Sequence, residues 1–192
     1  MRRMVSIDDI KDKLKTELKP SRYEHSVRVC EAALELAERY GLPKDKVALA
    51  AILHDCGRKV SVEDSIAKAK ELGLEIDFVE EHQPILLHQK LGAYFAEHEY
   101  GVRDGEILEA IRRHSVGGRN LSVLAQVIYL ADLIETGRKF PGVEDLRKAT
   151  SSGLQEGMLM AYAHTIKFLT DTKQLVHPDC VEGYNQLLVK GL

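Results

Sequence analysis

The chain has 192 residues, of which 44% are hydrophobic and 30% are charged, a composition typical of one globular domain. Its formal net charge of -3 argues against a broad nucleic-acid-binding face, because such a face is basic. No apolar run approaches the length of a membrane span, and residues 1–10 lack the apolar core of a signal peptide. We therefore expect a cytoplasmic protein with no nucleic-acid partner and no membrane partner.

Helix-forming residues dominate the chain, and apolar residues recur at helical spacing without the alternation typical of strands. The caps and breakers predict helices over 7–18, from Ser21 to Gly41, from Pro43 to Gly57, from Ser61 to about Gly73, and over 86–100, 105–114, 123–134, 143–150, 153–170 and 178–188. Residues 74–84 are expected to form a loop with at most one short turn. The sequence thus predicts an all-α bundle in which residues 1–192 form a single domain.

The placement of the histidines and acids in this pattern points to a metal site. His25 is predicted in a first helical turn, His88 at the start of a helix, and His114 at the end of one. The pair His54-Asp55 follows the apolar run 48–53, and Asp132 interrupts the apolar stretch 127–134. A carboxylate in such surroundings is costly unless a metal ion or a buried arginine compensates its charge.

Each of these features alone has another explanation. A histidine at a helix C-terminus can interact with the helix dipole, a buried aspartate can pair with arginine, and a His-Asp dipeptide occurs by chance. The six residues taken together favour a metal centre within residues 18–135, on which C-terminal helices over 143–190 would pack.

Imidazole and carboxylate ligands suit iron, manganese, cobalt, nickel or zinc better than magnesium or calcium. Six ligands exceed what one tetrahedral ion needs, so we predict a dinuclear site bridged by Asp55. One ion is expected on His25, His54, Asp55 and Asp132, and the other on Asp55, His88 and His114. His82 and His98 lie in polar surroundings and are expected on the surface.

These residues and their neighbours resemble the HD-domain superfamily of metal-dependent phosphohydrolases. Within it the chain is similar to the YqeK-type symmetrical bis(5′-nucleosyl)-tetraphosphatases. The resemblance is carried by residues 22–29, 51–55, 86–88, 110–115, 128–132 and 140–143. It implies an all-α HD-domain bundle, a two-metal site rich in iron, and hydrolysis of diadenosine tetraphosphate into two ADP.

The resemblance also implies the substrate contacts. Arg22 and Arg138 match positions that hold phosphates, Ser115 matches a position that contacts the nucleotide, and His177 matches a residue that closes over it. The chemistry predicts that a metal-bridging hydroxide attacks phosphorus, with Asp55 as the catalytic bridge and Lys59 neutralising charge on the phosphates. For each basic residue the alternative is a solvated surface side chain, and Glu24 is a candidate to orient His25 from outside the ligand set.

Two alternatives to this function stay open. An HD-domain phosphohydrolase with the same ligands could act on a nucleoside monophosphate or a cyclic dinucleotide instead. A nucleotide-binding regulatory module could retain the metals with little turnover. Association into a homodimer is also left open by the sequence.

Overall fold

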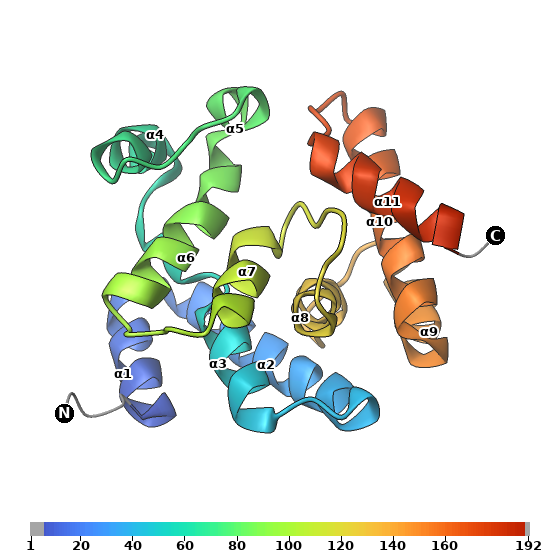
Figure 1. The fold of residues 1–192 in the computed structure, drawn as a ribbon, viewed down its shortest axis with the longest axis horizontal. Helices are drawn as coiled ribbons and strands as arrows, with labels where there is room; N and C mark the ends of the chain where they lie inside the picture. Colours follow the sequence, from blue (N-terminus) through green and yellow to red (C-terminus); the bar gives the residue numbers. More distant parts are fainter. Residues whose placement is uncertain (1–5, 191–192) are drawn as a thin grey trace.

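The computed structural model describes residues 6–190 and contains only helices in that range (Figure 1). The helices are α1 (Ile7–Glu17), α2 (Pro20–Tyr40), α3 (Lys44–Leu53), η1 (Cys56–Lys59), α4 (Val62–Glu71), α5 (Phe78–His82), η2 (Pro84–Leu86), α6 (Leu87–His98), α7 (Gly105–Arg113), α8 (Val123–Ile134), α9 (Val143–Ser152), α10 (Leu154–Asp171) and α11 (Pro178–Lys190), where η marks a 3-10 helix. The all-α prediction is confirmed. The expectation that no signal peptide is present rests partly on residues 1–5, which lie outside the described residues.

Short polar side chains begin several helices as the sequence predicts. In each case the side chain accepts a hydrogen bond from a backbone N–H of the first turn, as at Ser6, Ser61, Asp104 and Ser122. The predicted cap at Ser21 is wrong. The cap is Lys19, two residues earlier, because Pro20 takes the first helical position of α2.

Two predicted boundaries differ from the structure. Residues 74–84 contain more than one short turn, since Asp77 and Glu80 form a reciprocal capping box that starts α5, and η2 follows. Helix α3 ends at Leu53 rather than near Gly57. Gly57 instead lies where η1 contacts α6, and a Cβ there would be 2.0 Å from the His88 carbonyl oxygen and 2.6 Å from the Gly92 nitrogen. Tertiary contact, not helix termination, is the reason for this glycine.

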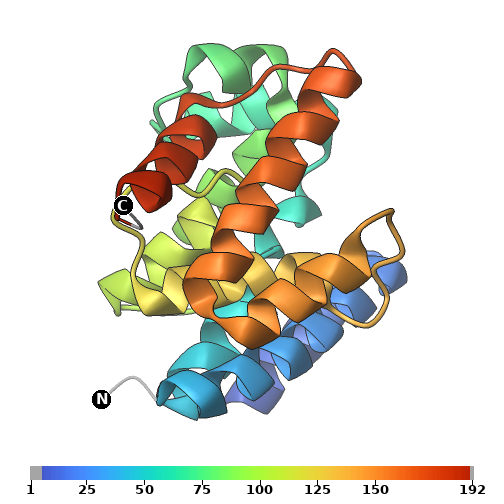
Figure 2. The same cartoon turned by 90° about the vertical axis from the view of Figure 1, so that its right-hand side faces the viewer.

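Helix α8 lies in the middle of the molecule, between the helices that precede it in the chain and α9 to α11 (Figure 1). On one side it packs against α2, α3 and α7, and on the other against α9 and α10, while α11 packs on α10 (Figure 2). Val127, Ile128 and Leu130 of this helix are fully buried. Helices α4 and α5 extend on one side of the space above α7 and α8, and α10 and α11 extend on the other side (Figure 1).

Cys30, Cys56 and Cys180 are buried and free of disulfides. Among residues 6–190, no helix combines the length and the apolar character needed to cross a membrane.

Candidate metal centre

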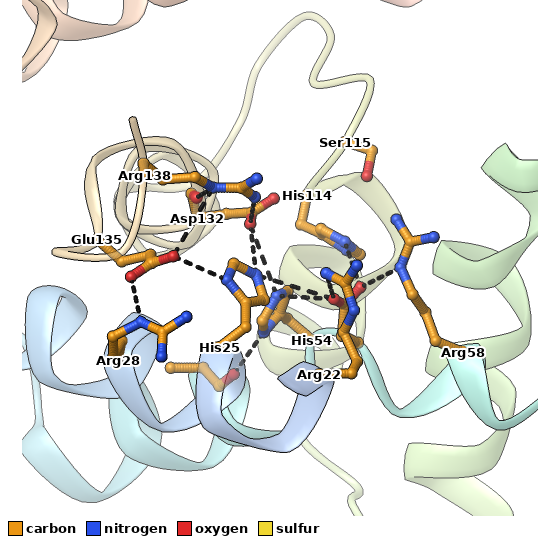
Figure 3. A network of polar contacts seen from close by, with 12 residues as sticks. Arg22, His25, Arg28, His54, Arg58, His114, Ser115, Asp132, Glu135 and Arg138 are labelled. Atoms are coloured by element: carbon orange, nitrogen blue, oxygen red, sulfur yellow. Dashed lines mark hydrogen bonds and ion pairs between the residues drawn. The ribbon is translucent and has the colours of Figure 1, made fainter. Parts of the chain in front are cut away.

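The six predicted ligands converge at one point of the bundle. They come from α2, from the end of α3 and the turn after it, from the start of α6, from the end of α7 and from the last turn of α8, and they are His25, His54, Asp55, His88, His114 and Asp132. Five of the six side chains are buried, and Asp132 is 15% exposed. Figure 3 shows His25, His54, His114 and Asp132 with their rings and carboxylate turned toward one another.

The carboxylate of Asp55 lies at the centre of the ligand set. Its Oδ2 atom is 3.9 Å from His25 Nε2 and 3.6 Å from His54 Nε2. Its Oδ1 atom is 3.4 Å from Nε2 of both His88 and His114. Neighbouring ligands of one transition-metal ion, with bonds near 2.1 Å, stand about 3 Å apart. Each oxygen of Asp55 therefore faces a different pair of histidines at nearly that spacing.

Asp132 lies in the last turn of α8. A negative charge at this end of a helix is unfavourable with the helix dipole, which increases the need for a cation. Its Oδ1 atom is 2.9 Å from His25 Nε2 and 3.9 Å from His54 Nε2. Arg138 Nη2 also donates to Oδ1 at 2.7 Å. Both kinds of compensation that the sequence leaves open, a ligand set and an arginine, are thus present.

Local backbone geometry orients three of the four histidines in the same way. Nδ1 of His54, His88 and His114 bonds to the carbonyl oxygen three residues earlier, at 2.7, 2.5 and 2.7 Å. Helix ends leave such carbonyls without a helical partner, so a histidine placed there donates to them readily. Nδ1 of His25 instead bonds to Glu135 Oε1 at 3.1 Å. Because a carbonyl can only accept, Nδ1 carries the proton in at least three rings, and Nε2 faces the cluster with its lone pair.

This arrangement of lone pairs fits a transition metal. Nε2 of His88 and Nε2 of His114 are 3.0 Å apart. Since both rings carry their proton on Nδ1, the two lone pairs face each other, and a cation coordinated by both would remove that repulsion. In the described residues, His54 Nε2 is buried and has no hydrogen-bond partner. A buried imidazole nitrogen of this kind is the donor that a divalent transition metal requires.

Burial sets the charge of the ligands. It lowers the pKa of His54 to about 4, partly offset by Asp55, and the pKa of His88 to about 3, with His114 acting in the same direction. Burial alone would raise the pKa of Asp55, but His54 and its other histidine neighbours outweigh it and hold that pKa well below its usual range. At neutral pH His54 and His88 are thus neutral imidazoles and Asp55 is an ionised carboxylate, the forms that bind metal.

Two arginines contact the Asp55 carboxylate. Arg22 Nη1 donates to Oδ2 at 2.9 Å, and Arg58 Nε donates to Oδ1 at 3.1 Å (Figure 3). Arg22 is one of the predicted phosphate-binding residues, whereas Arg58 is not singled out by the sequence analysis. Its position three residues after a ligand is the signal that could have identified it.

The residue that orients His25 is Glu135. Its other oxygen, Oε2, accepts hydrogen bonds from Arg28 Nε at 2.6 Å and from the Gly137 N–H at 2.5 Å. Glu24, the candidate taken from the sequence for this role, is exposed. Arg28 and Glu135 are not among the residues predicted from the sequence, although each lies three residues after a ligand. Arg28 lies on the same side of α2 as His25, and Glu135 is the C-cap residue of α8.

The structure places the other predicted site residues around this centre. Lys59 forms ion pairs with Glu99 and, at 3.6 Å, with Glu17, and its Nζ lies 4.2 Å from the centroid of the Phe95 ring. It is therefore held beside the centre rather than against Asp55, and its catalytic role stays a prediction. His82 and His98 are exposed, as expected.

Ser115 and His177 lie on the side of the centre toward α10 and α11. Ser115 Oγ is 3.2 Å from His88 Nε2. Ser115 and His177 line the same cavity. His177 Nε2 contacts Asp77 Oδ2 at 2.9 Å, which links the start of α11 to the start of α5 across that cavity. Their contacts with substrate stay predictions.

The fold and the ligand set define an HD-domain protein. The HD domain family profile matches residues 22–137, which include all six predicted ligands, and the chain belongs to this family. The symmetrical bis(5′-nucleosyl)-tetraphosphatase of Bacillus subtilis (strain 168) is 39% identical over 178 residues, 91% of this chain and 94% of that protein. The protein of the same name from Staphylococcus aureus (strain NCTC 8325 / PS 47) is 33% identical over 186 residues, 94% of this chain and 95% of that protein.

A solved structure gives the same result for the fold. The crystal structure of a predicted HD superfamily hydrolase involved in NAD metabolism from Clostridium acetobutylicum matches with a TM-score of 0.93 and 36% identity. The match covers 98% of this chain and 100% of that one. The resemblance inferred from the sequence is confirmed.

Proposed function

We propose that this protein is a metal-dependent hydrolase that cleaves diadenosine tetraphosphate symmetrically into two ADP. The observation that carries the proposal is the Asp55 carboxylate, which presents one oxygen to each of two histidine clusters. The similarity over nine-tenths of two proteins named symmetrical bis(5′-nucleosyl)-tetraphosphatase supports the choice of substrate. The site is dinuclear, with iron as the preferred metal and manganese, cobalt, nickel or zinc as alternatives.

The residues of the site fall into metal ligands and phosphate-binding arginines. His25, His54 and Asp132 hold one ion, His88 and His114 hold the other, and Asp55 bridges the two. When bound, the two ions supply Lewis acidity and lower the pKa of a coordinated water. Arg22, Arg58 and Arg138 lie next to the ligand carboxylates. Their guanidinium groups bind the phosphate oxygens of the substrate and offset their charge.

Product analysis tests the proposal. The purified protein, with metal content measured and with each candidate metal added in turn, is incubated with diadenosine tetraphosphate. We expect ADP as the only nucleotide product, and reaction in ¹⁸O-labelled water should label one of the two ADP molecules. ATP with AMP would show asymmetric cleavage and reject the proposal. A nucleoside monophosphate and a cyclic dinucleotide in the same assay test the alternative substrates.

An Asp55→Ala variant tests the role of the bridging carboxylate. We expect it to lose bound metal and to lower kcat by about 10³-fold or more, because both ions depend on this side chain. Asp171→Ala is the matched control, since Asp171 is exposed and contacts only Lys167 among the described residues. Hydrolysis that survives Asp55→Ala would contradict the two-metal mechanism, and metal binding without turnover in the unmodified protein would favour a regulatory module.

Location and assembly complete the proposal. The protein acts in the cytoplasm, either as a monomer or as a homodimer. Cell fractionation tests the first point, and light scattering of the purified metal-loaded protein decides the second.

A further inference from the structure

Two cavities open beside the metal centre and share a wall formed by Val62, Pro84 and Ile85. The larger, which we call the cationic cavity, has a volume of about 490 Å³ and is lined by Lys19, Arg22, Arg58 and Lys59 with Glu17 and Glu63. The smaller, the apolar cavity, has a volume of about 230 Å³ and is lined by Ser115, Val116, Leu169, Leu175, His177 and Cys180.

One predicted metal ligand links the two cavities through a side-chain contact. His88 lines the cationic cavity, and Ser115, which lines the apolar cavity, lies 3.2 Å from His88 Nε2. A chain of phosphates that passes over the metal centre can therefore extend into both cavities.

We propose that the cationic cavity is a separate nucleotide subsite, which holds one ADP half of the substrate while the apolar cavity holds the other. This inference rests on the proposed function. Cleavage at the middle of a symmetrical dinucleotide requires equal halves on both sides of the reacting bond. Since that bond must lie at the metal ligands, the two halves leave the centre in different directions.

The two arginines of the cationic cavity have N–H donors that are not used within the protein and can bind phosphates. Arg22 and Arg58 each use one nitrogen for Asp55, while a guanidinium carries five N–H donors. In residues 6–190 the side chains of Arg22 and Arg58 have no other hydrogen-bond partner, and they are 34% and 26% exposed. The remaining donors are placed to bind phosphate oxygens in pairs.

The volume of the cationic cavity and the residues on its wall fit a nucleoside diphosphate. A volume of 490 Å³ lies within the usual range for small-molecule sites, about 300–1,000 Å³, whereas the apolar cavity is smaller than that range. Val62 and Ile85 on the shared wall are 41% and 47% exposed, so each presents apolar surface that a base can cover. The cationic cavity thus binds one ADP half of the substrate mainly through its phosphates. The apolar cavity binds the other ADP half mainly through its nucleoside.

Binding of the product ADP to the metal-loaded protein tests the number of subsites. We expect equilibrium dialysis to give two ADP per chain in the unmodified protein. Arg58→Gln should weaken one of the two sites by about tenfold or more, as expected for a lost charge-assisted hydrogen bond. Metal content is measured in the same samples, because Arg58 contacts the ligand Asp55.

Charge changes at the rim of the cavity avoid the metal ligands. Lys19 and Glu63 are exposed, and both line the cationic cavity. At low salt, Lys19→Glu should raise KM for diadenosine tetraphosphate about fivefold with kcat unchanged, and Glu63→Lys should lower it. Lys148→Glu is the matched control, since Lys148 is exposed on α9, away from both cavities.

The outcomes separate this inference from the proposed function. A protein that forms two ADP but binds only one ADP per chain would overturn the second subsite alone. The same holds if KM does not respond to charge at Lys19 and Glu63, or responds equally at Lys148. Failure to form ADP from diadenosine tetraphosphate would instead reject the proposed function.

Discussion

Glu135 offers a sharp test of how the ligand set is oriented. The change is Glu135→Gln, which keeps the size of the side chain and an oxygen that can accept from His25 Nδ1. It removes the negative charge that contacts both His25 and Arg28. The side chain is only 2% exposed, so water does not replace the lost charge.

The magnitude follows from these contacts. Loss of a carboxylate behind a ligating histidine weakens metal binding by about 10- to 100-fold, or about 1.4–2.7 kcal/mol. With its oxygen on His25, the glutamine turns its NH2 group toward Arg28 Nε and the Gly137 N–H, which lose their acceptor. This loss lowers the stability of the fold rather than the metal affinity directly, and Arg28, whose side chain is 33% exposed, can bond to water instead. We therefore expect metal affinity to fall by about 10- to 100-fold while kcat at saturating metal stays within a few-fold.

Competition between the protein and a coloured chelator measures the affinity, and activity at increasing metal concentration measures its effect on hydrolysis. Glu24→Gln is the matched control, because Glu24 is next to His25 in sequence but exposed. Unchanged affinity in Glu135→Gln, or an equal loss in Glu24→Gln, would refute the assignment of Glu135.

Three further predictions concern stability. Removal of metal with a chelator should lower Tm by about 5–10 °C and re-addition should restore it, because an ion held at 100 times its Kd contributes about 2.7 kcal/mol; a Tm that does not move would contradict the site. In the folded protein the pKa of His54 is about 4 and that of His88 about 3, below the ordinary 6.5. Between about pH 6.5 and pH 4 these two histidines therefore bind more protons in the unfolded chain than in the folded one. The metal-free protein should therefore lose roughly 2–4 kcal/mol between pH 7.5 and pH 5 in urea denaturation, and a flat profile would be incompatible with neutral buried histidines. Gly57→Ala should cost about 3 kcal/mol or more, since its Cβ would lie 2.0 Å from a backbone oxygen, whereas Gly105→Ala, with nothing within 4 Å, should be close to neutral in the same assay.

Much of the metal centre is encoded in short segments of sequence. His54, His88 and His114 each lie at a helix end and bond to the carbonyl three residues earlier, so their tautomers depend on local backbone alone. Asp55 follows one ligand directly. The caps at Ser61 and Ser122 start their helices where the pattern indicates. These features need no contact between distant segments, and this is why sequence patterns reveal them.

Other features depend on how the helices pack. The sequence could not distinguish Glu24 from Glu135 as the partner of His25, because Glu135 reaches that ring from α8. Nor could it predict that Lys59 pairs with Glu99 of the turn after α6 instead of facing the centre.

The sequence by itself therefore determined the helical class, the six candidate ligands and the identity of the family. The tertiary structure alone decided which oxygen of Asp55 faces which histidines, that Arg58 joins the site, and that two different cavities open next to each other beside the ligands. The physical reason is the distance along the chain over which a sequence pattern specifies contacts. Helical periodicity specifies neighbours within about one turn, while distances between helices depend on the packing of the whole core.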